Sequence, residues 1–348
     1  MEVKTIEWLG DRVRWLNTML LPHEEVYVES DDYERLAVAI ERMEIRGAPA
    51  IGVAAAFGIA LATRKFSGSN LDEFKSYIYK VIGRFSRTRP TAVNLFWALD
   101  RIKKLVDSYL GSVEELKEII VNEAIRIYNE DLEVNRRIGL NGLKLIEDGD
   151  VVLTHCNAGA LATAGYGTAL SIIRAAWYSG KKIKVIATET RPILQGARLT
   201  VWELSKEGIP VKLITDNMIG YVMSKGLVDK VIVGADRVLI SGHVINKIGT
   251  YTIAIVADRH KVPFYVAAPT STIDVKTVVD NVVIEERDPN EVRYVLGKVL
   301  ITLPNVDVMN PAFDITPPEL VSAVVTEVGI AEKPINENLR KLLTNSHT

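Results

Sequence analysis

The chain has 348 residues, of which 42 are lysine or arginine and 44 are aspartate or glutamate, so its formal net charge is −2. This balance argues against a polyanionic partner such as nucleic acid. The single cysteine excludes an internal disulfide and fits a reducing cytoplasm. The length predicts about two domains, each large enough to bury its own hydrophobic core.

The sequence carries no sign of a membrane segment or of a secretion signal. The longest apolar run covers residues 48–63, is rich in alanine and glycine, and is too short to span a bilayer. The first residues lack the charged-then-apolar pattern of a signal peptide. We therefore expect a cytoplasmic protein with no membrane partner, and a buried helix over the apolar run.

The first part of the chain predicts a mainly helical domain that carries a few short strands. Residues 1–30 alternate apolar and polar side chains around breaks, which predicts two or three short strands. No low-complexity linker appears, so we place the boundary near residue 130, which gives domains 1–130 and 131–348. Helices, the last of them one long helix or two abutting ones, are predicted over residues 32–43, 71–84 and 113–145.

Arginines precede two of the helices in this part of the chain. Arg46 and Gly47 come before Ala48 and a proline in the first turn of the alanine-rich helix. Arg87 and Arg89 stand just before a second proline and another helix with apolar periodicity. Guanidinium groups and the free N–H groups of a helix start both bind anions, so these turns are candidate phosphate sites. The alternative is that each is an ordinary surface arginine.

The second part of the chain alternates short apolar runs with helical segments, which predicts a doubly wound parallel sheet in an α/β fold. The predicted strands cover residues 151–154, 183–187, 211–215, 230–233, 264–267 and 282–285. Right-handed crossovers bring the carboxyl ends of such strands to one edge of the sheet. The polar residues expected at that edge are His155, Cys156, Asn157, Glu189, Thr190, Arg191, Asp216, Asn217, Asp236, Arg237 and, a little later, Asn246 and Lys247.

The stretch 151–168, VVLTHCNAGALATAGYGT, is the centre of this arrangement. A buried strand leads into a polar turn and then into glycine and small residues, which predicts a helix that starts directly after the turn. Cys156 lies in the turn beside His155 and Asn157, where open α/β sheets bind their ligands. Surroundings of this kind activate a thiol, so Cys156 is a candidate catalytic residue. The alternative is an inert, small core residue.

Asp236 follows the predicted strand 230–233 within the motif GADR. In partly apolar surroundings, desolvation keeps a carboxyl group protonated nearer neutrality, which suits a general acid. The alternative is that Asp236 pairs with Arg237 or caps a helix. No spacing of His, Cys and Asp resembles a zinc site, and neither GxGxxG nor GxxxxGK[ST] occurs where a nucleotide would need it, so we predict no metal and no cofactor.

Several long segments carry a resemblance to a known family. They are, in chain order, IRGAPAIGVAAAFG, RPTAVNLFWALDRI, LTHCNAGALATAGYGTAL, ETRPILQGARLTVWEL, ITDNMIGYVM, GADRV, NKIGTYTIAIVA and PFYVAAPTSTID. From about residue 40 to residue 330 the sequence resembles the methylthioribose-1-phosphate isomerases.

The resemblance implies an isomerase of methionine salvage that converts 5-methylthio-D-ribose 1-phosphate to 5-methylthio-D-ribulose 1-phosphate. It implies a Rossmann-like C-terminal domain, an N-terminal helical domain and a homodimer. By the same resemblance, Cys156 and Asp236 match the catalytic pair. The residues that match substrate-binding positions are Arg46, Gly47, Ala48, Arg89, Gln195, Asn246 and Lys247.

One position departs from the family, because Thr188 stands where most members have Asp before ETRP. The related ribose-1,5-bisphosphate isomerases and initiation-factor regulatory subunits often have Thr there. The bisphosphate isomerases would need a second cationic site, and the regulatory subunits look like relatives without the catalytic pair. The hydrogen between C2 and C1 can move as a proton, through an enol phosphate, or as a hydride, and the sequence leaves both routes open.

Overall fold

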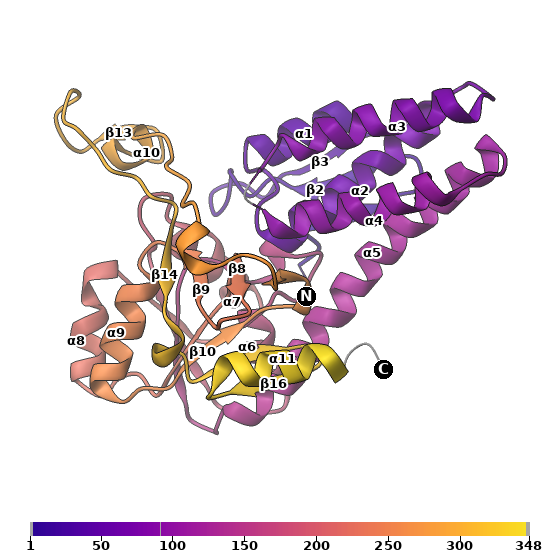
Figure 1. Cartoon of the computed structure of the whole chain (residues 1–348). Helices are drawn as coiled ribbons and strands as arrows, with labels where there is room; N and C mark the ends of the chain where they lie inside the picture. Colours follow the sequence, from indigo (N-terminus) through magenta and orange to yellow (C-terminus); the bar gives the residue numbers. More distant parts are fainter. Residues whose placement is uncertain (1–2, 91, 346–348) are drawn as a thin grey trace. The chain divides into compact units, whose positions relative to one another are not determined.

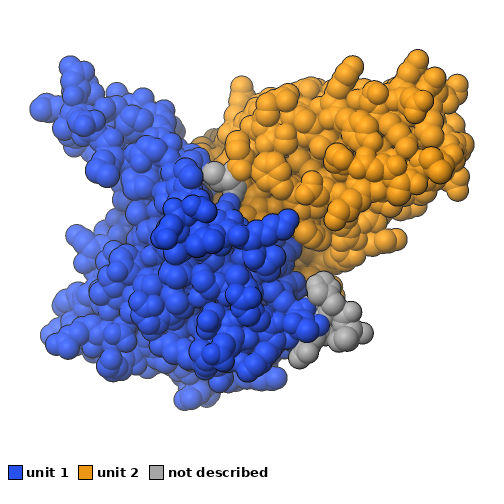
Figure 2. Space-filling view, in the orientation of Figure 1, with its two compact units in different colours: residues 1, 136–158, 168–348 blue, residues 2–135, 159–167 orange. Residues whose placement is uncertain are grey.

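The computed structural model describes residues 3–90 and 92–345 (Figure 1). These residues form two compact units, which Figure 2 shows in different colours. Unit 1 contains residues 136–158 and the described chain from Thr168 onward, and unit 2 contains the chain up to residue 135 together with the segment 159–167. The long helix α5 (Val113–Gly142) contributes to both units, and the predicted boundary at residue 130 lies within it.

Unit 2 is mainly helical and carries a small antiparallel sheet, as the sequence predicts. Asp32 starts the first helix by accepting the N–H of Glu34, and Asn70 starts the third by accepting two N–H groups of its first turn. The strands are β1 (Ile6–Trp8), β2 (Val13–Leu16) and β3 (Tyr27–Ser30), and the helices are α1 (Tyr33–Glu41), α2 (Ala48–Lys65), α3 (Leu71–Ser86) and α4 (Val93–Ser108).

Helix α2 is the buried centre of unit 2. Nearly all of residues 48–63 are buried, because this stretch consists of alanine, glycine and apolar side chains. A Cβ at Gly52 would lie 2.7 Å from the carbonyl oxygen of Asn94 in α4, and a Cβ at Gly58 would lie 2.0 Å from the ring of Phe85 in α3. Both glycines are therefore needed for the close packing of α2 against its neighbours.

Unit 1 is built on a seven-stranded sheet with the order β16-β15-β10-β7-β4-β5-β6. All neighbouring strands pair in parallel except β16, so the predicted doubly wound parallel sheet is confirmed. The strands are β4 (Val151–Thr154), β5 (Lys184–Thr188), β6 (Val211–Ile214), β7 (Lys230–Val233), β10 (Phe264–Ala267), β15 (Ala323–Thr326) and β16 (Gly329–Glu332). The helices among them are α6 (Ala169–Tyr178), α7 (Val201–Lys206), α8 (Ile219–Ser224), α9 (Thr250–His260) and α11 (Ile335–Asn345).

A second sheet in unit 1 has the strand order β11-β8-β9-β14. Its strands are β8 (Arg237–Leu239), β9 (Val244–Lys247), β11 (Ile273–Asp274) and β14 (Phe313–Thr316). Residues 282–311, called the arm below, project from the rest of this unit (Figure 1). The arm carries α10 (Asn290–Arg293), β12 (Tyr294–Val295) and β13 (Val299–Leu300).

The strand predicted over residues 282–285 does not form. These residues lie at the start of the arm, outside every strand, and Val283 is 86% exposed. The prediction is wrong because a short apolar run looks the same whether it enters a sheet or crosses the surface. The place in the parallel sheet is taken instead by β15, which pairs with β10.

Candidate functional site

The candidate residues of the site fall on both units. Arg46, Gly47, Ala48 and Arg89 belong to unit 2. The remaining candidates belong to unit 1, and these are Cys156, Gln195, Asp236, Asn246 and Lys247.

In unit 2, the two arginine-bearing turns precede helices that lie side by side. Gly47, with a φ of 90°, is the residue before α2, and Arg46 comes directly before it. Arg89 stands shortly before α4. Because Gly52 near the start of α2 packs against Asn94 in the first turn of α4, both helices begin at the same end of unit 2. That end therefore carries two half-buried arginines and two helix N-termini, a combination suited to an anion.

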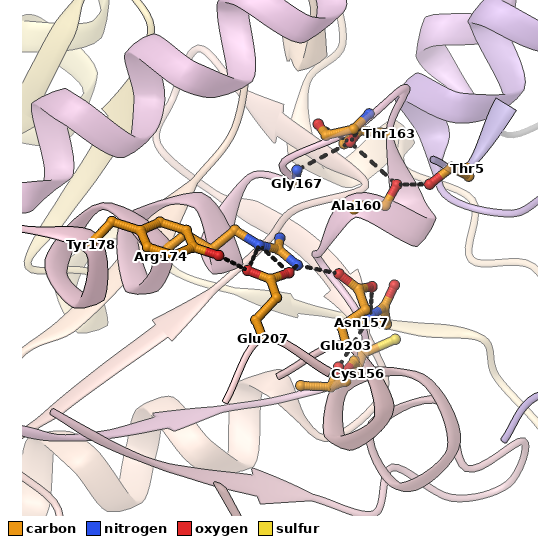
Figure 3. Close-up of polar contacts among 12 residues, drawn as sticks. Thr5, Cys156, Asn157, Ala160, Thr163, Gly167, Arg174, Tyr178, Glu203 and Glu207 are labelled. Carbon is orange, nitrogen blue, oxygen red and sulfur yellow. Dashed lines mark hydrogen bonds and ion pairs between the residues drawn. The ribbon is translucent and has the colours of Figure 1, made fainter. Parts of the chain in front are cut away.

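The segment 159–167 packs against the start of α2. A Cβ at Gly47 would lie 2.4 Å from the carbonyl oxygen of Ala162. The Thr5 hydroxyl donates to the carbonyl of Ala160 at 2.5 Å, a contact drawn in Figure 3. These contacts hold the segment to the N-terminal part of unit 2, although Cys156 and its neighbours belong to unit 1.

The helix expected directly after the Cys156 turn begins later. The chain forms a short 3-10 turn at Ala160–Ala162, and α6 starts only at Ala169. The prediction of a helix N-terminus at this turn is wrong, because the small residues serve a different purpose. They bring the backbone close to α2, and Ala164 is buried in the core of unit 2.

Cys156 and Asp236 follow neighbouring parallel strands. Cys156 comes after β4 and Asp236 after β7, and these strands pair directly, so both residues lie at the same edge of the sheet. The strand ends approach closely, since a Cβ at Gly234 would lie 2.7 Å from the Cβ of Ala158. Cys156 is 7% exposed and has a left-handed φ of 59°. This is the edge where α/β sheets bind their ligands.

Asp236 leads into a strand rather than into a helix. Its N–H donates to the carbonyl of Ile245 at 3.0 Å, next to the pairing of β8 with β9. The neighbouring Arg237 forms an ion pair with Asp274, with 3.5 Å between Nη1 and Oδ2. The alternative that Asp236 caps a helix is therefore wrong.

His155 is a neutral ring with a defined tautomer. Its Nε2 lies 2.9 Å from the carbonyl oxygen of Ile248, which only accepts, so Nε2 carries the proton. Its Nδ1 then accepts from the hydroxyl of Thr188 at 2.6 Å. Burial lowers the pKa of His155, so the ring stays uncharged at neutral pH. Thr188, the residue that departs from the family pattern, thus forms a hydrogen bond with His155, the residue before Cys156.

Asn157 joins Cys156 to a buried charged cluster, shown in Figure 3. Its Nδ2 donates to Glu203 Oε1 at 2.8 Å, and Glu203 Oε2 pairs with Arg174 at 2.8 Å. Arg174 also pairs with Glu207, and the side chains of Arg174 and Glu203 are 3% and 0% exposed. This cluster was not predicted from the sequence. Its signal was an arginine in the otherwise apolar helix ALSIIRAAWY, because a buried cation requires buried partners.

The other candidates of unit 1 are buried polar side chains. Gln195 is 7% exposed, and its Oε1 has no hydrogen-bond partner among the described residues. Asn246 Nδ2 donates to the hydroxyl of Thr250 at 3.0 Å, and Lys247 Nζ lies 5.2 Å from the ring centroid of Phe313. A buried amide oxygen without a partner is destabilising unless a bound molecule donates to it. Gln195 is thus the candidate whose geometry points most directly to a ligand.

Within the described part of the chain, no cluster of three or more His, Cys, Asp or Glu side chains could hold a metal ion. None of the helices in residues 3–90 and 92–345 is both long enough and apolar enough to cross a membrane.

Comparisons with known proteins identify the family. A model described as the initiation factor 2 subunit family matches residues 44–333. The chain is 52% identical over 345 residues to a methylthioribose-1-phosphate isomerase of Thermotoga petrophila, covering 99% of each protein. It is also 52% identical over 346 residues to the isomerase of the same name from Petrotoga mobilis, covering 98% of this chain and 99% of the relative.

Solved structures give the same result. The crystal structure of 5-methylthioribose 1-phosphate isomerase from Pyrococcus horikoshii is 44% identical, with a TM-score of 0.92 and coverage of 98% of this chain and 96% of that one. A structure described as translation initiation factor eIF-2B, subunit delta, from A. fulgidus is 48% identical, with a TM-score of 0.88 and coverage of 98% and 99%. Since the match extends over nearly the whole chain in both sequence and fold, this protein belongs to the initiation factor 2 subunit family and, within it, to the methylthioribose-1-phosphate isomerases.

Proposed function

We propose that the protein converts 5-methylthio-D-ribose 1-phosphate to 5-methylthio-D-ribulose 1-phosphate. The observation that carries the proposal is the presence of a thiol and a carboxyl group, Cys156 and Asp236, after two directly paired strands of the sheet. The names of the relatives support the same activity. The expected cytoplasmic location and homodimeric state stay predictions.

The chemistry of the substrate explains why such groups are needed. The phosphate ester on C1 removes the free aldehyde on which ordinary aldose–ketose isomerases act, so the ring has to open while the phosphate stays in place. We assign Asp236, in its protonated form, the role of a general acid that acts at the ring oxygen or the C2 hydroxyl. We assign Cys156 to the hydrogen that moves between C2 and C1, either by carrying it as a proton or by stabilising its transfer as a hydride. Burial of the thiol excludes water and strengthens the electrostatic interactions of either route.

The remaining candidates have binding roles in this proposal. Arg46 and Arg89, with the backbone at Gly47 and Ala48, would bind the phosphate, because guanidinium groups and free helix N–H groups are strong anion donors. The sugar hydroxyls would bind to the buried polar residues Gln195, Asn246 and Lys247. A hydroxyl that donates to the Oε1 of Gln195 would also satisfy a buried acceptor that otherwise has no partner among the described residues.

Substitution of the proposed catalytic pair tests the function. We expect Cys156→Ser and Asp236→Asn each to lower kcat by about 100-fold or more, because each removes a group that acts on the reacting atoms. Turnover is measured with purified variants whose far-UV circular dichroism matches that of the unsubstituted protein. Asp280→Asn, which changes an exposed carboxyl group, is the control and should keep the full rate. A fully active Cys156→Ser enzyme would refute the role of the thiol.

The same assay addresses the second candidate, ribose 1,5-bisphosphate, because Thr188 stands where the methylthioribose-1-phosphate isomerases usually have Asp and the related bisphosphate isomerases often have Thr. Both sugars are offered to the enzyme in parallel. The proposal requires the higher kcat/KM with the methylthio sugar, and a preference for the bisphosphate would transfer the assignment to the related isomerase. No turnover of either sugar would favour a non-catalytic role in translation initiation, since the A. fulgidus structure is described as translation initiation factor eIF-2B, subunit delta.

A further inference from the structure

Cys156 has a backbone conformation that an L-residue adopts only when its surroundings hold it. Its φ of 59° lies in the left-handed region. For a residue with a Cβ this conformation is sterically unfavourable. Such residues cluster at functional sites, where several contacts determine them together. Two residues after the end of β4, a left-handed residue also turns the Cα–Cβ bond out of the alternating pattern of the strand, and so sets the direction of the thiol.

Both main-chain polar groups of Cys156 are held by threonine hydroxyls. Its N–H donates to Thr190 Oγ1 at 2.8 Å, and its carbonyl oxygen accepts from the Thr200 hydroxyl at 2.6 Å. Both threonines are 0% exposed, so neither bond competes with water. Thr190 follows β5, whereas Thr200 ends the helical turn Gly196–Thr200 that leads into α7. Two separate segments therefore hold one residue by its two peptide groups.

Thr190 is itself firmly placed. It too is left-handed, with a φ of 63°. Its N–H and the N–H of Arg191 donate to the two carboxylate oxygens of Asp216, at 2.8 and 2.7 Å. Its hydroxyl oxygen accepts the N–H of Cys156, and its hydroxyl proton can therefore be donated to Thr188 Oγ1, which lies 3.1 Å away. The acceptor of the Cys156 N–H is thus fixed from both its backbone and its hydroxyl.

Thr200 is fixed by the charged cluster. Its hydroxyl oxygen accepts from Asn157 Nδ2 at 3.2 Å, and the same Nδ2 donates to Glu203 at 2.8 Å. Because an amide nitrogen only donates, the single proton of Thr200 is left for the carbonyl of Cys156. Glu203 in turn pairs with Arg174, so the support of Cys156 extends into a buried ion pair (Figure 3).

We propose that Thr190 and Thr200 are positioning residues for the thiol of Cys156. Their hydroxyls hold the left-handed turn and thereby the direction of Sγ, and they act through Cys156 rather than on the sugar. The proposal rests on the proposed function, in which Cys156 serves the hydrogen transfer. A contact that orients a reacting group without binding substrate should change kcat and leave KM unchanged.

Paired substitutions at Thr200 and Thr190 test the proposal. Thr→Val keeps the shape of the side chain and removes the hydroxyl, and Thr→Ser keeps the hydroxyl. We expect Thr200→Val and Thr190→Val each to lower kcat about tenfold, with KM changed by less than about twofold. The Ser variants should retain kcat to within about threefold, because the hydrogen bond is the part that matters.

A second readout needs no substrate. Because Cys156 is the only cysteine of the chain, the rate of alkylation by iodoacetamide reports on this thiol alone. We expect the Val variants to react several-fold faster, because the released turn exposes the sulfur, and the Ser variants to react at the unsubstituted rate. Thr316→Val is the matched control. Thr316 is as buried as the two positioning threonines, and its hydroxyl has no hydrogen-bond partner among the described residues, so both readouts should stay unchanged.

The outcomes separate this proposal from the proposed function. Unchanged kcat and unchanged alkylation in both Val variants would overturn the positioning role even if Cys156→Ser is inactive. The proposal would also be overturned if the Ser variants lost as much kcat as the Val variants. The same holds if KM increased by the same factor by which kcat decreased. If a Val variant does not fold, the Ser variant at the same position and the Val variant at the other still decide between these results. A fully active Cys156→Ser enzyme would instead remove the proposed function, while the alkylation rates still report on the turn.

Discussion

At Gly47 two separate constraints act on one residue. Its φ of 90° is a backbone conformation that side chains disfavour, and a Cβ there would also lie 2.4 Å from the carbonyl oxygen of Ala162. At Gly149 the φ is 89°, yet no atom lies within 4 Å of the position that a Cβ would take. Both glycines therefore have a positive φ, and only Gly47 also has a steric constraint.

Alanine substitutions separate these two effects. We expect Gly149→Ala to lower the free energy of unfolding by about 1–2 kcal/mol, the cost of the left-handed backbone alone. Gly47→Ala should lower it by about 3 kcal/mol or more, because a φ of 90° with a ψ of 134° is open almost only to glycine and the overlap with Ala162 adds an overpacking cost. Urea unfolding followed by circular dichroism measures both values. An equal decrease in the free energy of unfolding in both variants would show that segment 159–167 can move away from the added methyl group without an energetic cost.

At the scale of single elements, Asp314 of β14 organises the start of α9. Its carboxylate accepts the N–H of Gly249 at 2.7 Å and the N–H of Tyr251 at 3.1 Å. Burial nevertheless raises the pKa of Asp314 to about 6, since these two bonds only partly offset the loss of hydration. The folded protein thus binds a proton that the unfolded chain releases near pH 4.

This raised pKa gives stability a pH dependence of known sign. The contribution of Asp314 is fully present below the pKa of the unfolded chain and is lost as the pH rises to about 6, because the folded state holds the extra proton. Asp314→Asn does not titrate. From pH 4 to pH 7 we therefore expect its free energy of unfolding to increase relative to the unsubstituted protein by up to about 3 kcal/mol.

Denaturant titrations at several pH values measure this difference. Asp258→Asn alters an exposed carboxyl group of the same helix and should keep the pH profile of the unsubstituted protein. Parallel pH profiles for Asp314→Asn and the unsubstituted chain would contradict the assignment.

Element patterns account for how much of the fold could be predicted. Helix α3 and strands β4, β7 and β10 lie within a few residues of their predictions, because each has a periodicity or an apolar run that spans the whole element. The second sheet could not be predicted, since its strands are short and their pairing joins distant parts of the chain. From the sequence alone the small residues after Cys156 predict a helix start, although the same residue types also permit a close backbone contact.

The candidate site, too, could be predicted from the sequence only in part. The placement of Cys156 and Asp236 at one edge of the sheet follows from general rules for parallel sheets, so it could be predicted, whereas the direct pairing of their strands could not. The hydrogen bonds that Thr190 and Thr200 make with Cys156 could not, because a threonine hydroxyl has the same appearance in sequence whatever its partner. The partners of Arg174, Glu203 in α7 and Glu207 just after it, could not be predicted either, because they lie about 30 residues further along the chain.

At the scale of the whole molecule, the chain passes from one unit to the other and back around segment 159–167. In unit 2 this segment is held by Thr5 at Ala160 and by Asp131, whose carboxylate accepts the N–H of Ala164 at 2.7 Å. Burial raises the pKa of Asp131 to about 7, which fits a carboxyl group enclosed by this packing.

Hydrogen exchange tests how strongly Asp131 holds the segment. We expect Asp131→Ala to speed amide exchange over residues 160–167 by roughly fivefold to tenfold, because the N–H of Ala164 loses its acceptor. Peptides from α6 should keep their rates and serve as an internal reference. Glu133→Ala removes an exposed acid from the same helix and should change neither region. Unchanged exchange over residues 160–167 in Asp131→Ala would mean that other contacts suffice to hold them.

The interleaved path of the chain has a consequence for dissecting this protein into parts. A fragment that stops at residue 135 lacks the backbone against which Gly47 and Asp131 pack, and the complementary fragment carries that backbone without its partners. No single cut therefore releases an intact copy of either half. Separating the two requires removal of residues 159–167 from one piece and their grafting onto the other.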